Sequence, residues 1–164
     1  AVTSWSSHAQ LVSAGLYSLG HGSNDAQKTI GIITGLLFSA GYLKTFSIPL
    51  WVVGAAYTTM ALGTLYGGKR IIKTMGQKIF KLKPLDGVCA ETASAISIFL
   101  ATSMGVPVST THVITGAISG VGAAQRFSAV KWGVELRIVW GWFFTIPATP
   151  IIAFALYSSG ARLF

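Results

Sequence analysis

Four polar side chains in one short segment are the first candidates for chemistry. The segment GHGSNDAQK, residues 20–28, lies between two apolar stretches and carries Asn24, Asp25, Gln27 and Lys28. Ionisable side chains inside apolar segments of a membrane protein are costly, and they mark routes for ions or solutes. Carboxylate and amide oxygens are typical ligands of hard cations. We therefore expect Asp25 and Asn24, together with Gln27, to hold a cation.

A second polar segment, PVSTTH, supplies donors for an anion. It contains three consecutive hydroxyl side chains, Ser109, Thr110 and Thr111. Such residues cap helix N-termini, so we expect a short helix to begin near His112, and Pro107 disfavours helix just before it. Free N–H groups at a helix N-terminus attract anions, and the hydroxyls add donors that suit a tetrahedral oxyanion.

Asp25 restricts what such an anion site can do. A carboxylate beside a bound anion needs a cation between the two or a proton upon it. The two segments together therefore predict cation-coupled anion transport, with Na⁺ or H⁺ as the coupling ion and Na⁺ held at Asp25 and Asn24. Phosphate at neutral pH can donate a hydrogen bond that sulfate cannot, so Asp25 as an acceptor favours phosphate.

Each of these residues also has a purely structural interpretation. Asp25 and Lys28, three residues apart on one helix face, would then form an intramembrane ion pair. His112 would only hydrogen-bond within its turn, and Glu91 would only favour a helix N-terminus. Otherwise Glu91, Lys28 and His112 are candidates for residues that transport requires, and the remaining histidines carry less weight.

Composition places the chain in a membrane. Of its 164 residues, 10% are charged and 52% are hydrophobic, whereas about 25% are charged in soluble domains. Twelve Lys and Arg residues against four acidic ones give a net charge of +8. An excess of positive charge is typical of proteins that bind nucleic acid and of cytoplasmic loops of membrane proteins. The high apolar content favours the membrane protein over the nucleic-acid binder. The single cysteine, Cys89, excludes an internal disulfide and a Cys-based zinc site.

The elements that must position these residues are the helices of an all-α integral membrane protein. A helix needs about 20 residues to cross a hydrocarbon core of roughly 30 Å. As one straight helix, residues 9–42 would be roughly 50 Å long, which is too long unless the helix is tilted, broken or partly outside the membrane. Asn24 with Gln27 has the chemistry of a capping pair, so we favour a broken helix there. Residues 49–67 predict a transmembrane helix with Pro49 near its start.

The basic segment 69–83 holds six Lys and Arg residues and no acid. The positive-inside rule predicts a cytoplasmic loop, and the roughly helical spacing of its apolar residues would let it lie along the membrane interface. An ordinary anchoring loop and a specific lipid site are the two alternatives for it.

The rest of the chain predicts a hairpin and a long final helix. Residues 88–124 end in an apolar run of twelve residues after PVSTTH, about 18 Å of helix, which is too short to span. Because basic residues follow, we expect a re-entrant helical hairpin that enters and returns on the cytoplasmic side. Residues 128–162 include Pro147 and Pro150 and predict one kinked helix or two helices. The sequence has no Ser-His-Asp order, P-loop or metal-ligand spacing, so we expect no enzyme and no cofactor.

The polar segments also resemble those of a known family. GHGSNDAQKTIG is followed in order by KTMGQKI, CAETASAISIFLATSMGVPVSTTHVITGAISGVG, VKWG and WFFTIPAT. Over residues 15–150 this order is similar to the inorganic phosphate transporter (PiT) family. Members are secondary transporters built from two inverted repeats, each with one copy of both segments, around a site near the membrane midplane. The chain has one copy of each segment and resembles the C-terminal repeat.

This resemblance implies roles for individual residues. Phosphate would be held by Ser109, Thr110 and Thr111, and we expect Asn24 of the first segment to contact it as well. The coupling cation would be served by Asn24 and Asp25. Glu91, in AETASA, matches a family position implicated in transport.

The leading hypothesis is therefore cation-coupled inorganic phosphate symport by alternating access, in a multi-pass protein of the plasma or cell inner membrane. The alternatives are sulfate transport by the same site and a non-transporting receptor or accessory membrane subunit. We expect the chain, which shows no signal peptide, to be a piece of a longer assembly whose N-terminal repeat completes the site. That repeat, phosphate, the coupling cation and lipid are the expected partners, and a homo-oligomer is also expected. The basic asymmetry of residues 69–83 argues against two oppositely inserted copies of this chain forming one site.

Overall fold

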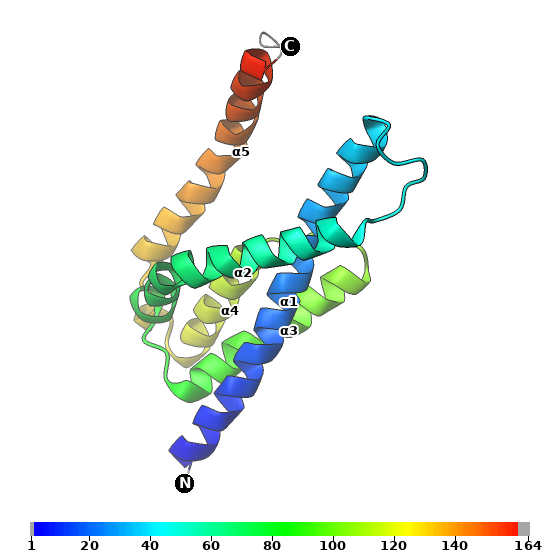
Figure 1. Cartoon of the computed structure of the whole chain (residues 1–164). Coiled ribbons are helices and arrows are strands. Elements are labelled where there is room, and N and C mark those ends of the chain that lie inside the picture. The colour runs from blue at the N-terminus through cyan, green and yellow to red at the C-terminus, as the bar shows by residue number, and fades with distance from the viewer. Residues whose placement is uncertain (1, 161–164) are drawn as a thin grey trace. The chain divides into compact units, whose positions relative to one another are not determined.

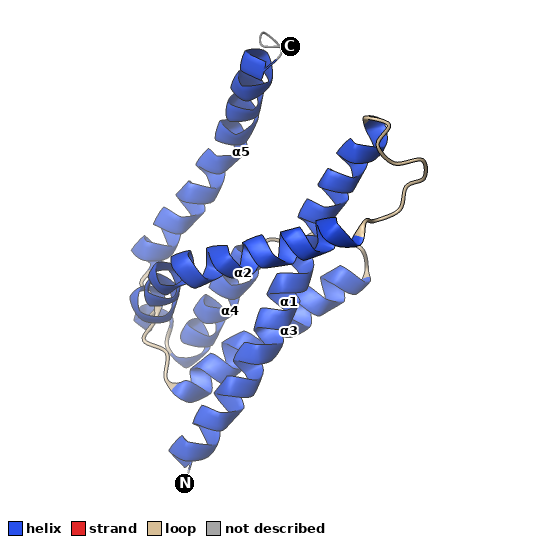
Figure 2. Ribbon diagram, viewed as in Figure 1, coloured by secondary structure: helices blue, strands red, loops and turns tan. Residues whose placement is uncertain are grey.

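The computed structural model describes residues 2–160, except for the side chains of residues 2–4 and 69–72. The described chain is helical and has no strand (Figure 1, Figure 2). Its elements are α1 (Val2–Ser39), α2 (Leu50–Lys73), the π-helix η1 (Thr74–Ile79), α3 (Pro84–Ser103), α4 (Thr110–Gln125), the 3₁₀ turn η2 (Phe127–Ala129) and α5 (Trp132–Gly160). The chain forms two compact units, Ala1–Val130 and Lys131–Phe164, each of which is described by itself.

The helix α1 runs without interruption through the polar segment where the sequence predicts a break. Figure 1 shows it as a single ribbon, from dark blue at the N-terminus to light blue. The predicted broken helix in residues 9–42, with Asn24 at a new helix start and Gln27 as its capping partner, is therefore wrong. The 38 residues of α1 make a helix about 57 Å long at 1.5 Å per residue.

The polar side chains of this segment do not interrupt the helix, because they lie on one face and three of them, Asn24, Asp25 and Lys28, have hydrogen-bond partners outside α1. Four of them follow a spacing of three or four positions, which places them on one face: His21, Asn24, Asp25 and Lys28. The glycines of this segment cost roughly 1 kcal/mol each relative to alanine, which is too little to end a long helix that is packed on its neighbours. Gly20 also has a packing role, since a Cβ there would lie 3.4 Å from side-chain atoms of Ile98 and of Phe99 on α3.

The first unit is held together by the packing of α1 against α3 and α2. Figure 1 shows α3 beside α1. On the α2 side, an apolar cluster joins Ala26 and Ile30 of α1 to Val52 and Ala56 of α2. These contacts fix the rotation of α1 about its axis and so decide which way its polar face is presented.

The helices α3 and α4 form an antiparallel pair joined by residues 104–109. The turn begins at Gly105, whose φ of 71° lies in the left-handed region that favours glycine. At the other end of the pair, Asp86 of α3 accepts hydrogen bonds from the Gln125 side chain of α4 and from the Lys83 backbone N–H. Of these two helices, α3 is long and apolar enough to cross a membrane by itself. A re-entrant path for residues 88–124 therefore stays a prediction.

The basic segment 69–83 is mostly helical, in agreement with the roughly helical spacing of its apolar residues in the sequence. The helix α2 continues to Lys73 and the π-helix η1 follows, so that only residues 80–83 lack helical structure. The segment is held because Ile79 is fully buried and Phe80 packs closely over Gly122 of α4. The side chains of Lys69 and Arg70 lie outside the described residues, and the cytoplasmic location of the segment stays a prediction.

In the second unit, residues 132–160 form one helix, α5, which agrees with the first of the two alternatives for residues 128–162, one kinked helix or two helices; a kink stays a prediction. Pro147 and Pro150 both lie inside this helix, and none of its residues is buried. By length and composition, α3 and α5 are the two described helices able to cross a membrane, which is consistent with a membrane protein. The span predicted for residues 49–67 corresponds to the first part of α2, which begins one residue later, at Leu50, and its membrane-crossing role stays a prediction.

Candidate functional site

The two polar segments meet at the carbonyl oxygen of Val108. Asn24 Nδ2 donates a hydrogen bond to this oxygen at 2.8 Å, and Lys28 Nζ donates to it at 2.6 Å. Val108 directly precedes the N-cap of α4, in the non-helical turn of the α3–α4 pair. Two donors from α1 therefore tie the middle of that helix to the N-terminus of α4.

Asp25 is the centre of a polar cluster at this junction. Its Oδ1 accepts hydrogen bonds from Lys28 Nζ and Asn24 Nδ2, both at 3.1 Å. Its Oδ2 accepts from Thr110 Oγ1 at 3.3 Å and lies 3.4 Å from His21 Nδ1. The side chains of Asp25 and Lys28 are 31% and 35% exposed, so both remain accessible to a ligand.

Asn24 is almost fully buried, with 3% of its surface exposed, and its neighbours fix the orientation of its amide. Nδ2 faces two acceptors, the Val108 carbonyl and the Asp25 carboxylate. The reverse orientation would set three oxygens against one another. Both amide hydrogens are thus used, and the atom that Asn24 can offer to a ligand is Oδ1, an acceptor. This favours a cation over an oxyanion as the ligand of Asn24.

The start of α4 has the cap that the sequence predicts. Ser109 is the N-cap, and its Oγ accepts from the His112 backbone N–H at 3.4 Å and lies 2.6 Å from His112 Nδ1. Thr110 is buried and donates to Asp25, whereas the side chains of Ser109 and Thr111 are exposed. Because the first N–H groups of a helix have no partner within it, this turn and Thr111 keep donors for an anion.

An open groove of about 400 Å³ lies next to this cluster. Asn24, Gln27 and Lys28 line it from α1, and the other side includes Thr102, at the end of α3, and Pro107. A predicted cation ligand and a lysine that can bind an anion therefore border the same open space.

Lys28 changes the electrostatic argument made from the sequence. A carboxylate beside a bound anion needs a compensating positive charge, and the Lys28 ammonium supplies one 3.1 Å from Asp25. The structural ion pair considered for these two residues is thus present. The carboxylate by itself no longer requires a bound cation, and the acceptor Oδ1 of Asn24 becomes the stronger argument for one.

Two predicted residues contact neighbours other than Asp25. Gln27 Nε2 donates to Ser23 Oγ, one turn back on α1, at 3.4 Å. His112 contacts Ser109 in its own turn, as its structural interpretation predicts. Gln27 still lines the groove, whereas His112 serves the cap of α4.

Glu91 belongs to a second polar contact between α1 and α3. Its Oε2 accepts a hydrogen bond from Ser13 Oγ at 2.6 Å. Next to it, the Gln10 amide occupies the space above Gly87 that a Cβ would need. Ser13 lies 12 positions before Asp25, which is about 18 Å along a helix. The structure therefore separates Glu91 from the Asp25 cluster.

Sequence reasoning missed His21, Ser13 and the Val108 carbonyl. His21 lies four positions before Asp25, a spacing that identifies it as a neighbour once the segment is treated as helical. Ser13 and Val108 contact residues 78 and 84 positions away. No local pattern signals contacts of that range.

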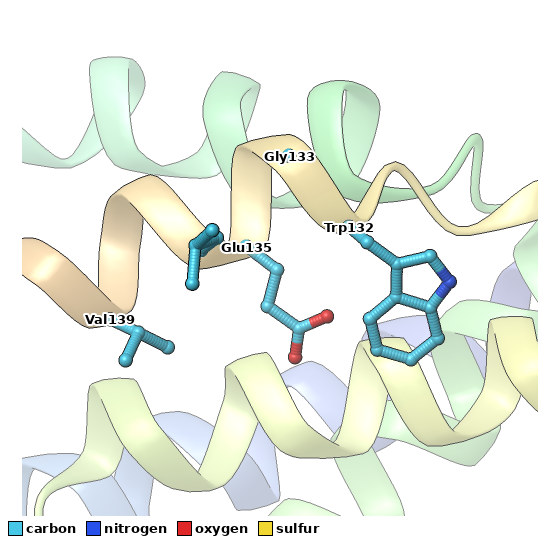
Figure 3. A pocket seen from close by; sticks show the side chains of 5 residues that line it. Trp132, Gly133, Glu135 and Val139 are labelled. Carbon is cyan, nitrogen blue, oxygen red and sulfur yellow. The ribbon is translucent and has the colours of Figure 1, made fainter.

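A second hollow, of about 390 Å³, lies on α5. Figure 3 shows the side chains of Trp132, Glu135 and Val139 on the same side of this helix. One carboxylate among mostly apolar neighbours has no further charged group in the lining to act with. The hollow contains none of the predicted residues, and we assign no site to it.

Comparison with known proteins identifies the family. The model of the phosphate transporter family matches residues 1–153. The chain belongs to the phosphate transporter family. Both polar segments fall within the matched residues, so the junction of Asn24 and Lys28 with Val108 lies inside the region that defines membership.

Relatives of named function are considerably longer than this chain. A probable low-affinity inorganic phosphate transporter of Rhizobium meliloti (strain 1021) is 60% identical over 149 residues, which cover 90% of this chain and 45% of that protein. A protein of the same description from Bacillus subtilis (strain 168) is 46% identical with the same coverage. Sodium-dependent phosphate transporter 1-B of Danio rerio is 31% identical over 150 residues, which cover 90% of this chain and 23% of that protein. The chain thus spans less than half the length of these relatives, and no solved structure matches it.

Proposed function

We propose that this chain is one half of a cation-coupled inorganic phosphate symporter that works by alternating access. The observation that carries the proposal is the junction at Val108, where Asp25 and Lys28 lie beside the N-terminus of α4 and an open groove. The second half would be another repeat, on the same polypeptide or on another chain, since the chain spans under half of its relatives.

Phosphate would bind between Lys28 and the first turn of α4. An ammonium group has three N–H donors, and Lys28 uses two of them, on Asp25 and Val108. The third donor, the exposed Thr111 hydroxyl and the amides of this turn suit an oxyanion. Ser109 and Thr110 would shape this turn more than they contact phosphate, because both hydroxyls have protein partners. Asp25 still has acceptor capacity on its carboxylate, which favours an anion that carries a proton, such as phosphate, over sulfate.

The coupling cation would bind at Asp25 and at Oδ1 of Asn24. We favour Na⁺ over H⁺ because an amide oxygen coordinates Na⁺ but does not take up a proton. The name of the Danio rerio relative, a sodium-dependent phosphate transporter, also supports Na⁺. Lys28 would keep the net charge of this cluster low enough for a cation and an anion to occupy it together.

A second half would cover the site on its open side. Inverted-repeat transporters place their substrate between repeats near the membrane midplane and expose it to each side in turn. Under this proposal the groove of the first unit faces that second repeat, and the basic segment 69–83 lies on the cytoplasmic side of a multi-pass protein.

The test is equilibrium binding of labelled phosphate to the complete purified transporter, with sulfate as competitor. We expect saturable phosphate binding that excess sulfate does not displace, and weaker binding by about tenfold or more in Lys28→Met because a charge-assisted donor is removed. Lys44→Met, an exposed lysine in the α1–α2 connection, is the matched control and should bind as the unmodified protein does. Displacement by sulfate, or equal phosphate binding by Lys28→Met, would contradict the proposed substrate or site.

A further inference from the structure

A buried hydroxyl at the end of α3 has no hydrogen-bond partner among the described residues. It is Oγ1 of Thr102. A buried polar atom without a partner is unfavourable, so each one calls for an explanation such as a ligand or a bound ion. The other side-chain hydroxyls of this kind belong to Thr34, Ser94, Thr115 and Ser119. Thr102 differs from them because it lines the groove that Asn24 and Lys28 also line.

The packing of α1 on α3 independently places Thr102 next to Asn24. Ser13 contacts Glu91, and Gly20 lies against Ile98, so both pairs are 78 positions apart and the two helices run parallel. Both helices rise by the same distance per residue, so other residue pairs of α1 and α3 that are 78 positions apart also lie at the same level. The same offset pairs Asn24 with Thr102. Register and groove lining therefore agree that Thr102 lies near Asn24.

We propose that Thr102 Oγ1 is a ligand of the coupling Na⁺, together with Asn24 Oδ1 and the Asp25 carboxylate. This inference rests on the proposed function and adds a residue to its cation site. Hard cations take oxygen ligands from carboxylates, amide carbonyls and neutral oxygens. A threonine hydroxyl has two acceptor lone pairs, so Thr102 can offer one of them to the ion. Two neutral acceptors beside a carboxylate attract a cation.

The test compares two substitutions of Thr102 in the complete transporter. Thr102→Val keeps the shape and removes the oxygen, whereas Thr102→Ser keeps the oxygen. Equilibrium binding of ²²Na⁺ is one readout, and the Na⁺ concentration that gives half-maximal phosphate uptake is the other. We expect Thr102→Val to weaken Na⁺ binding and raise the half-maximal concentration by about tenfold, as expected for loss of one good ligand. Thr102→Ser should stay within about threefold of the unmodified protein.

Ser103→Ala is the matched control on the same helix end, because that exposed hydroxyl donates to the Leu100 carbonyl of its own helix. It should leave both readouts unchanged. Unchanged Na⁺ binding in Thr102→Val would overturn the inference, and so would a raised phosphate KM at saturating Na⁺ with unaltered Na⁺ binding. Uptake driven by protons without Na⁺ binding would overturn it as well, while leaving phosphate symport standing. Na⁺ binding that depends on Thr102 in a protein without phosphate uptake would support the ligand and contradict the proposed function.

Discussion

Asn24 and Val108, 84 positions apart in the sequence, are joined by a hydrogen bond of 2.8 Å from amide to carbonyl. The bond links the middle of α1 to the turn before α4. The second hydrogen of the Asn24 amide is donated to Asp25, so neither hydrogen is left for a ligand. What Asn24 has left is an oxygen, and this assigns it to the cation in the proposed transport cycle.

The first prediction tests whether Asp25 and Lys28 bind the transported ions or only form an ion pair that stabilises the fold. Asp25→Asn and Lys28→Met should each lower phosphate uptake, and the neutral double variant should lower it too, by about tenfold or more, because both ligands lose a charged partner. The measurement is uptake of labelled phosphate per amount of transporter in the membrane.

A purely structural pair gives a different result in the same assay. Removing one partner would leave an unpaired charge, and removing both would relieve it, so uptake by the double variant would return toward that of the unmodified protein. Such a recovery would contradict the proposed roles of Asp25 and Lys28 in binding.

The second prediction concerns the anchoring of the basic segment. A Cβ at Gly122 would come within 2.7 Å of Val130 and 3.1 Å of the Phe80 ring, whereas Gly120 has open space around it. Gly122→Ala should therefore destabilise the protein by about 1–3 kcal/mol through overpacking. A thermal unfolding midpoint that falls in Gly122→Ala but not in Gly120→Ala, measured in detergent, would confirm this packing. Equal midpoints would show that the segment is not held at this point.

The third prediction separates charge from packing at Glu91. Glu91→Gln keeps an oxygen that accepts from Ser13, so the protein should remain folded, while phosphate uptake falls by about tenfold or more if transport requires the charge. Ser97→Ala, an exposed hydroxyl on the same helix that bonds to its own turn, should have no effect. Normal uptake by Glu91→Gln would reduce Glu91 to a structural contact with α1.

The fourth prediction concerns membrane orientation. Lys81 is an exposed residue of the basic segment, which the positive-inside rule places in the cytoplasm. Lys81→Cys, with Cys89 and any other cysteine of the complete transporter replaced by serine, should react with a membrane-impermeant maleimide only after the cells are permeabilised. Labelling of intact cells would place the segment outside and reverse the proposed orientation.

The sequence predicts those features of the site that depend on residues within a few positions of one another. Ser109 as the N-cap follows from a hydroxyl residue just before a helix, and the pairing of Asp25 with Lys28 follows from a three-residue spacing. The helical class follows from apolar segments of helical length. Each of these needs neighbours within about one helical turn.

Contacts between distant segments explain where the sequence prediction fails. Asn24 and Gln27 have the composition of a capping pair, but the amide of Asn24 is drawn to Val108 on another element, so α1 continues as a helix. Burial of Ile79 similarly anchors the basic segment, and the charge pattern of that segment does not predict where it packs. In both cases the local structure depends on a contact with a residue far away in the sequence, and a local sequence pattern does not predict such contacts.

The most direct measurement is uptake of labelled phosphate into proteoliposomes that contain the complete transporter, under an imposed Na⁺ gradient and with excess unlabelled sulfate. The junction of Asp25, Asn24 and Lys28 predicts uptake that requires the Na⁺ gradient and is unaffected by sulfate. Uptake abolished by sulfate, uptake indifferent to Na⁺, or no uptake would contradict Na⁺-coupled phosphate symport by this site.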